Sequence, residues 1–327
     1  MSKIKIPFMG LKAKRICLEN LDLKDKTFLL SYGYDINPLK QSIGRVGLLN
    51  PPVVRKKSDA THQIVCGYKR VLALKRLGVS SIRCTVLPSE KNDEECLLLN
   101  IYDNVSHREF NTIEKSIAIN KLTNYYTEEE IVHNFLPALK LQPHITQLKV
   151  FKPLCKLEKG IQTAILEGRI SEHTAIRLSK MDRASRRAFG KLFVILRLSV
   201  SKQIEVLEYV SEIAMRENLS VENVIGMQKI SSVFKNEKLN QHQRGETVRK
   251  YLRELRYPQL TEKEKEFNHN IKKLKLSPGV SFKAPPFFEG DHYHISLYFK
   301  DRNGLKKRLQ ELESLLNDRS LINIIEG

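Results

Sequence analysis

Residues 66–78 read CGYKRVLALKRLG, a glycine followed by a cation-rich turn and then by the spacing of an amphipathic helix. Lys69 and Arg70 fall at the start of that helix, where unpaired amides and the helix dipole already make the potential positive. A bound phosphate would accept from the free amides and pair with both side chains. Alternatively, both cations point into water and Gly67 only ends a strand. The segment therefore predicts either an anion site or an ordinary strand-to-helix turn.

The sequence around this segment mixes short strand-like runs with helices. The runs PPVVRKK, HQIVCG and SIRCTVL have strand character, whereas NPLKQSIGRVG and KRVLALKRLG have helical spacing. We therefore expect an α+β domain over residues 1–112.

Three segments of this domain carry a family resemblance. They are LKQSIGRVGLLNPPVVR (residues 39–55), IVCGYKRVLALKRLG (64–78) and DNVSHREFNTIEKS (103–116). In order and distance they resemble the signature of the ParB partition-protein N-terminal domain. The matching positions are Ser42, Ile43, Gly47, Leu48, Pro51 and Val54, then Gly67, Arg70 and Ala73, then Asn104, Asn111, Ile113 and Glu114.

The resemblance implies a DNA-binding protein switched by CTP and Mg²⁺, which clamps DNA as a dimer and hydrolyses CTP slowly. Carried over by position, Gly67 and Arg70 contact phosphate, while Asp103 and Asn104 face the metal. Lys69, His107 and Arg108 complete the expected nucleotide site. Gly47 fits a close approach to the same nucleotide, or else it is a helix C-cap.

The chain departs from the family pattern at several of these positions. Tyr68 replaces the motif's glutamate, Lys69 its first arginine and Leu72 its final arginine. Asp103 is one methylene shorter than the family glutamate, and His107 stands where arginine is expected, with Arg108 one residue later. Lysine keeps the charge but not the bidentate fork of arginine. His107 is a phosphate donor or a solvated loop residue, and we expect hydrolysis of CTP to be slow or absent.

The charge of the whole chain indicates a polyanionic partner. Its 327 residues include 56 Lys and Arg against 37 Asp and Glu, which gives a net charge of +19 and a pI of about 9.6. Nucleic acid is favoured over a membrane surface, because no long apolar span or basic amphipathic terminal helix is present. No signal-peptide core is seen at the start, so we expect a cytoplasmic, nucleoid-associated protein. The five widely spaced cysteines predict buried free thiols.

The excess of positive charge is concentrated in the helical middle of the chain, residues 113–230. Residues 138–202 hold 14 Lys and Arg against only 4 Asp and Glu, unlike a mixed solvated face. The family carries a helix-turn-helix here, and Thr127 before EEE is a good N-cap for its first helix. The second helix should begin near Pro143 and be stopped by Pro153 after about three turns. The candidate DNA contacts are Thr146, Gln147, Lys149, Lys152, Lys156, Arg183, Arg186 and Arg187.

Residues 231–327 should form a connecting helix and a small C-terminal β-β-α unit. Alternation in YHISLYF predicts a strand, and we expect Phe287 and Phe288 in the core of this unit. The same tail could instead be the partner surface of a protein-interaction adaptor. Length and tail fit a homodimer, and the resemblance leaves a partner ATPase open.

An enzyme on the same fold, a nuclease or a phosphotransferase, is the main alternative function. A nuclease needs clustered carboxylates for metal ions, and Asp103, Glu109 and Glu114 are the candidates near the pocket.

Overall fold

The computed structural model describes residues 11, 13–57, 61–290 and 292–325, and the chain divides into two compact units, residues 1–204 and 205–327. Each unit is described by itself. Along the described residues, no helix is both long enough and apolar enough to span a membrane.

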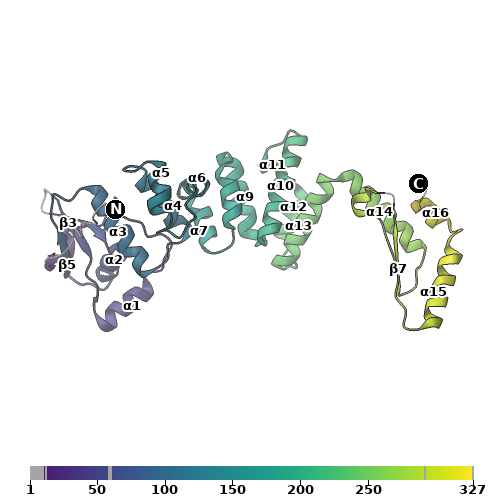
Figure 1. Cartoon of the computed structure of the whole chain (residues 1–327), viewed down its shortest axis with the longest axis horizontal. Helices are drawn as coiled ribbons and strands as arrows, with labels where there is room; N and C mark the ends of the chain where they lie inside the picture. The colour runs from purple at the N-terminus through teal and green to yellow at the C-terminus, as the bar shows by residue number, and fades with distance from the viewer. Residues whose placement is uncertain (1–10, 12, 58–60, 291, 326–327) are drawn as a thin grey trace. The chain divides into compact units, whose positions relative to one another are not determined.

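The first unit begins with a mixed five-stranded sheet (Figure 1). Its strands are β1 (Ala13–Cys17), β2 (Leu21–Asp22), β3 (Val53–Lys56), β4 (His62–Cys66) and β5 (Ser81–Leu87), in the order β1-β5-β3-β4-β2. The pairs β1/β5 and β3/β4 are antiparallel, whereas β3/β5 and β2/β4 are parallel. The three strands expected from the sequence are all present, which confirms the α+β prediction.

Three helices accompany this sheet. They are α1 (Asn37–Val46), α2 (Tyr68–Arg76) and α3 (Asp93–His107). Apolar side chains of the strands, α1 and α2, among them Val54, Ile64 and Val71, form a buried core. The core fixes the turn between β4 and α2, where the sequence placed its candidate anion site. Three of the five cysteines, Cys66, Cys84 and Cys96, are buried, but Cys17 on the edge strand β1 is exposed, contrary to expectation.

The remainder of the first unit is helical. Its elements are α4 (Thr112–Leu122), α5 (Glu128–Glu130), the π-helical turn η2 (Ile131–Phe135), α6 (Ile145–Phe151), α7 (Lys159–Leu166), α8 (Glu172–Ser179) and α9 (Arg183–Leu196). Thr127 caps α5 in a capping box with Glu130, as predicted. Helix α6 has seven residues and is shorter than the predicted three turns. It starts only after the N-cap His144, and Pro153 has no amide to extend it.

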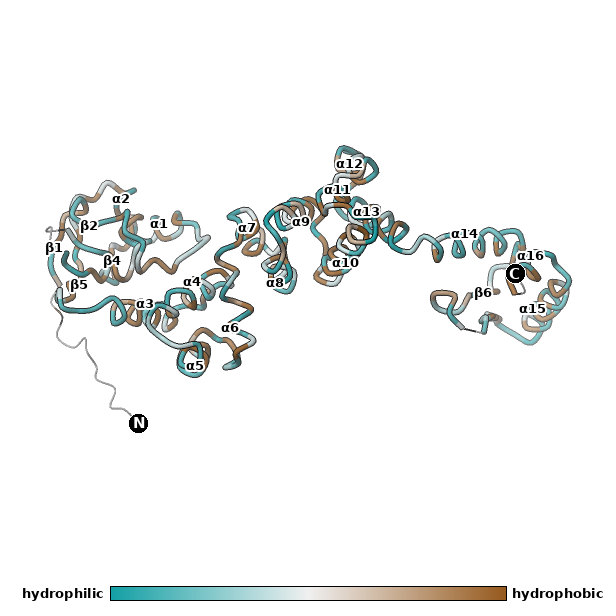
Figure 2. The backbone as a smooth tube through the Cα atoms, turned by 90° about the horizontal axis from the view of Figure 1, so that it is seen from above, coloured by the Kyte–Doolittle hydropathy of each residue, from teal (hydrophilic) through white to brown (hydrophobic). Residues whose placement is uncertain are grey.

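The second unit contains most of α10 (Val200–Arg216) and then α11 (Val221–Ile225), α12 (Gln228–Lys235), α13 (Gln241–Arg256) and α14 (Pro258–Lys273). Helix α14 is coloured largely as hydrophilic in Figure 2, and its buried residues are the polar Thr261 and Asn270. Ion pairs such as Arg253–Glu264 join α13 to α14.

A small β-hairpin lies near the C-terminus, as predicted. It pairs β6 (Val280–Lys283) with β7 (His294–Leu297) and is followed by α15 (Arg302–Leu315) and α16 (Arg319–Ile325). The expectation for Phe287 was wrong, because its side chain is 70% exposed. Phe288 is half-buried and packs edge-on against Phe267, with 5.6 Å between ring centroids. Both residues have φ near +57°, so the turn directs two adjacent rings to different surroundings.

Candidate functional site: a cationic cavity in the N-terminal domain

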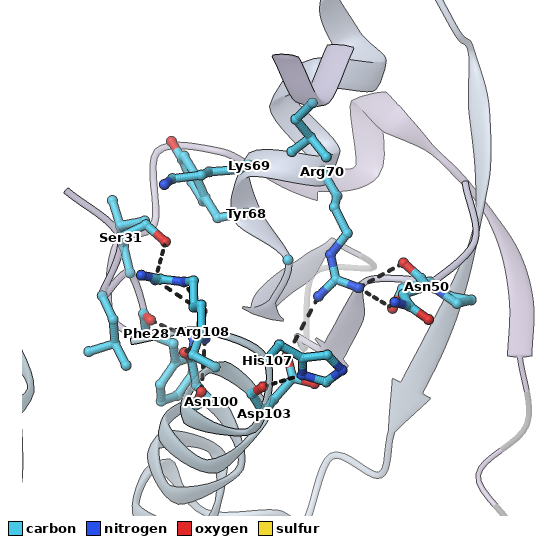
Figure 3. Close-up of a pocket in the computed structure, with 16 residues that line it drawn as sticks. Phe28, Ser31, Asn50, Tyr68, Lys69, Arg70, Asn100, Asp103, His107 and Arg108 are labelled. Atoms are coloured by element: carbon cyan, nitrogen blue, oxygen red, sulfur yellow. Dashed lines mark hydrogen bonds and ion pairs between the residues drawn. The ribbon is translucent and has the colours of Figure 1, made fainter. Parts of the chain in front are cut away.

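A cavity of about 530 Å³ opens where the strand β4 meets α2 (Figure 3). Its walls come from the chain around Phe28–Ser31, the loop before β3, the start of α2 and the last half of α3. The charged side chains that line it are the cations Lys69, Arg70 and Arg108 and the single carboxylate Asp103, with His107 beside them. The cavity is therefore positive, and it brings together six of the seven residues that the sequence assigned to a nucleotide.

Gly67 is the N-cap of α2 and adopts a left-handed conformation, with φ +86° and ψ 24°. It has no side chain to cap the helix, so the first amides of α2 find no side-chain partner at this position. A Cβ atom at Gly67 would lie 2.7 Å from Nε of Arg70. The backbone conformation therefore favours glycine here, and a Cβ would displace the flexible end of the Arg70 side chain.

Arg70 crosses the cavity toward the loop before β3. Its Nη1 donates to the carbonyl oxygens of Asn50, at 2.7 Å, and Pro51, at 3.3 Å. Its Nη2 lies 3.6 Å from a carboxylate oxygen of Asp103. Carbonyl groups and one loose ion pair hold this guanidinium in place, so its positive charge stays largely uncompensated.

Arg108 is held much more tightly, by Glu114. Two parallel hydrogen bonds join them, Nη1 to Oε2 at 2.6 Å and Nη2 to Oε1 at 3.0 Å. The Glu114 side chain is fully buried, at position N3 of α4, and also accepts from the amides of Tyr32 and Asn111. Arg108 thus links the cavity wall to the first helix of the helical region.

Lys69 lies beside Arg108, over the ring of Tyr34. Its Nζ is 3.4 Å from the Tyr34 ring centroid, and the Arg108 guanidinium lies 4.9 Å from the same centroid. The pKa of the Lys69 amine is lowered to about 8, mainly by burial; the charge of Glu114 opposes this shift and that of Arg108 adds to it. In Figure 3, Lys69 and Arg108 approach the cavity from one side and Arg70 reaches toward Asn50 on the other.

The residues expected to face a metal lie near the end of α3. Asn104 is already engaged: its Nδ2 donates to the Asn100 carbonyl at 2.9 Å, and its Oδ1 accepts from Nη2 of Arg108 at 3.1 Å. Asp103 keeps its carboxylate at the cavity, and its carbonyl oxygen lies 2.7 Å from Nδ1 of His107. A helix C-terminus is the favourable end of the dipole for a cation.

The residues that line the cavity suit a polyphosphate. They suit a metal ion only when a bound polyphosphate supplies further ligands. Three cations, the αL glycine and the open helix start suit phosphate oxygens. Mg²⁺ commonly takes one or two carboxylates together with substrate phosphates, and Asp103 supplies one. Across the described ranges, no group of three or more His, Cys, Asp or Glu is placed to hold a metal by itself.

The geometry weakens the nuclease alternative. Glu114 is bound to Arg108, and Glu109 forms ion pairs with Lys115, at 3.3 Å, and Lys140, at 3.1 Å. These carboxylates and Asp103 do not converge on one point among the residues that the structure describes.

Gly47 lies outside the cavity lining. It is the C-cap of α1, with φ +79°, and its amide donates to the Ile43 carbonyl at 2.9 Å. No atom lies within 4 Å of a Cβ built there, so its geometry matches the helix-end alternative.

The candidate DNA contacts divide into exposed and paired cations. Lys149, Lys156 and Arg187 are exposed and have no ion-pair partner in the described part of the chain, and Arg183 is 78% exposed, with its Nε at the long distance of 3.9 Å from a Glu158 carboxylate oxygen. Lys152 instead pairs with Glu128 at 3.2 Å, and Arg186 with Glu158 at 3.3 Å. On α6, Thr146 is exposed and Gln147 half-buried. The exposed cations are free to meet phosphates, whereas the paired ones hold the helices together.

Comparison with known proteins supports the interpretation of residues 32–105. Residues 32–105 match the family model of the ParB N-terminal domain. Over this segment the chain is similar to the ParB N-terminal domain. The resemblance that the sequence motifs indicated is therefore confirmed, and the matched residues include Gly67, Lys69, Arg70 and Asn104 from the cavity.

Two curated relatives each match less than half of this chain. A nucleoid occlusion protein of Oceanobacillus iheyensis is 30% identical over 149 residues, which are 45% of this chain and 49% of the relative. One of Lysinibacillus sphaericus is 29% identical over 140 residues, 43% of this chain and 45% of the relative. The chain thus spans about half the length of these curated relatives. The Caulobacter crescentus ParB structure with the parS site is 19% identical, with a TM-score of 0.35, over 60% of this chain and 98% of that one.

Sequence reasoning missed several residues that shape the cavity. The segment Phe28–Ser31, Asn100 and Tyr34 belong to none of the three motifs, yet Asn100 Nδ2 donates to the Phe28 carbonyl at 2.8 Å and Tyr34 contacts both Lys69 and Arg108. The Asn111-to-Glu114 spacing of a capping box was the one local signal that Glu114 would be fixed at a helix start.

Proposed function

We propose that this chain is a ParB-like DNA-binding protein whose N-terminal cavity binds CTP with Mg²⁺ and whose helical region binds DNA. The observation that carries the proposal is the start of α2. There an αL glycine, Lys69 and Arg70 converge with Arg108 on one cavity inside a ParB N-terminal domain.

The nucleotide phosphates would bind at the open end of α2. Gly67 permits their close approach, Arg70 pairs with them from the side of Asn50, and Lys69 from the side of Tyr34. Bound Mg²⁺ would neutralise part of the triphosphate charge. Asp103 is the carboxylate placed to hold the ion. When Asp103 binds the ion, its ion pair with Arg70 is lost and Arg70 becomes available to phosphate.

Turnover of CTP should be slow or absent. Asp103 is the single carboxylate in the lining and is shared with Arg70 at 3.6 Å, and Nδ1 of His107 is held 2.7 Å from the Asp103 carbonyl oxygen, so the candidate bases of the cavity are already engaged. The nucleotide then acts as a switch rather than as a substrate to be consumed quickly.

DNA binding is assigned to the exposed cations of residues 138–202. Positioning on a duplex needs only phosphate contacts, whereas base reading needs a rigid helix in the major groove. The short α6, with Thr146 and Gln147, is the element available for base contacts. We also propose a homodimer, as for a clamp that encloses DNA, and association with the nucleoid.

A structure determined with CTP and Mg²⁺ tests the cavity directly. We expect the phosphates within hydrogen-bonding distance of the Gly67–Lys69 backbone and the Arg70 guanidinium. An empty cavity at saturating nucleotide, with or without DNA, would remove the CTP part of the proposal and leave the DNA part to be judged by binding alone.

A further inference from the structure

Lys69 is a half-buried lysine whose amine has no polar partner among the described residues. Within the described ranges no carboxylate or carbonyl pairs with its amine, whose neighbour is the aromatic face of Tyr34 at 3.4 Å. Lys57, by contrast, is paired with Asp22 and Asp25, and the amine of Lys121 donates to the carbonyls of Lys26 and Thr27. A half-buried amine without an acceptor keeps its proton less readily and its lone pair more available.

The charged and titratable groups facing this amine are Tyr34, Arg108 and Glu114. Glu114 is already bound by both nitrogens of the Arg108 fork, so its charge is largely satisfied. The result is a pKa of about 8 for Lys69, caused first by burial. At pH 7 about a tenth of this amine is therefore uncharged and able to act as a nucleophile.

The same cavity also contains groups that can bind a phosphate leaving group. Arg70 and the open amides at Gly67 line it together with Lys69, and Arg108 stands on the Lys69 side. We infer that Lys69 is an acylation site for small acyl phosphates, with the phosphate held by Arg70 and the start of α2. The inference rests on the cavity binding phosphate, as the proposed function does, but it does not require the cavity to accept CTP.

The reaction balances without any further reagent. The neutral Nζ attacks the carbonyl carbon of the acyl phosphate, a C–N bond forms, and the C–O bond to phosphate breaks. Inorganic phosphate leaves with the electron pair, and the amine proton passes to water. The product amide carries no charge, so acylation removes one of the three cations of the cavity and lowers its affinity for any polyphosphate.

Timed acetylation of the full chain by acetyl phosphate at pH 8, read by mass spectrometry, tests the inference. Lys75 is the matched control, because it lies on the same helix and is exposed. About half of Lys69 is neutral at that pH against less than about 1% of an ordinary lysine. Lower basicity also reduces intrinsic nucleophilicity, as for thiols, so we expect Lys69 to react about tenfold faster than Lys75.

Two further experiments distinguish the reactivity of the Lys69 amine from the contribution of the phosphate-binding groups. Acetic anhydride carries no phosphate, so the preference for Lys69 over Lys75 should be smaller with it than with acetyl phosphate. Arg70→Gln should reduce the Lys69 rate with acetyl phosphate and leave the Lys75 rate unchanged. Equal rates at Lys69 and Lys75 with acetyl phosphate, or an equal preference with both reagents, would overturn the inference. Selective acetylation of Lys69 in a chain that does not bind CTP would support the inference and would contradict the proposed binding of CTP.

Discussion

Arg108 and Glu114 form a bidentate ion pair, at 2.6 and 3.0 Å, in which the carboxylate is fully buried and the guanidinium reaches the nucleotide cavity. This pair ties the end of α3 to the start of α4, so the cavity wall and the helical region share one electrostatic contact.

Removing Arg108 should destabilise the fold strongly. Arg108→Ala leaves the Glu114 charge buried without its partner, and a loss of roughly 3–5 kcal/mol in the free energy of unfolding is expected for such a broken pair. Urea denaturation measures it. Arg45→Ala, an exposed arginine on α1, is the control and should change stability by less than about 0.5 kcal/mol. A loss under 1 kcal/mol for Arg108→Ala would show that Glu114 is compensated elsewhere.

Gly67→Ala should cost nucleotide affinity as well as stability. Gly67 and Gly78 both have positive φ, +86° and +74°, so alanine at either site should cost about 1–2 kcal/mol of stability. At Gly67 alone the new Cβ meets Arg70, while at Gly78 no atom lies within 4 Å. Melting curves should therefore look alike for the two variants, and CTP affinity should fall in Gly67→Ala only. A normal affinity in Gly67→Ala would place the phosphates away from this turn.

Affinity for CTP should fall as the pH rises above about 8. The amine of Lys69 has a pKa near 8 because of burial, and it binds phosphate only when protonated. Titrations from pH 7 to 9.5 should show the decline in the native chain and a flatter profile in Lys69→Gln.

The free energy of unfolding should rise between about pH 8 and 10, whereas the affinity for CTP falls. The unfolded chain keeps the Lys69 proton up to the ordinary lysine pKa, so it binds more protons than the folded chain above about pH 8. The desolvation cost of the charged amine is therefore present below pH 8 and is relieved toward pH 10. Chemical denaturation of the native chain and of Lys69→Gln should differ in slope over this window, and parallel slopes would show that Lys69 titrates normally.

DNA affinity should depend steeply on salt through the exposed cations of the helical region. About six phosphate contacts give a slope of log K against log salt near −5. Changing Lys149, Lys156, Arg183 and Arg187 together to alanine should flatten that slope by up to about 4 on every duplex. Lys152 forms an ion pair with Glu128, and Arg186 forms one with Glu158. These two cations should therefore contribute more to the stability of the fold than to the salt dependence of DNA binding. A slope near zero in the native chain would mean that this surface does not bind DNA.

The sequence predicted the local parts of the site better than the contacts between them. The β4-to-α2 turn could be read from Gly67 and the residues after it, because backbone freedom and apolar spacing are local properties. The contacts of Tyr34 with Lys69 and Arg108 could not be predicted, because they join residues that are far apart in the sequence. Arg186 and Lys152 were expected to contact DNA, and the sequence did not show that the fold places Glu158 and Glu128 beside them. Phe287 was expected in the core, and a turn with positive φ turns it outward.

The central claim is that Arg70 and the start of α2 bind the phosphates of CTP. Isothermal titration with CTP, ATP, GTP and UTP, each with Mg²⁺, tests it most directly on the native chain, Arg70→Ala and the control Arg45→Ala. We predict binding of CTP in preference to the other nucleotides, unchanged in Arg45→Ala and abolished in Arg70→Ala. The Arg70→Ala variant should stay folded, because Arg70 is held mainly by two loop carbonyls, those of Asn50 and Pro51. Heat of binding equal in all three proteins, or none for any nucleotide with or without DNA, would contradict the account.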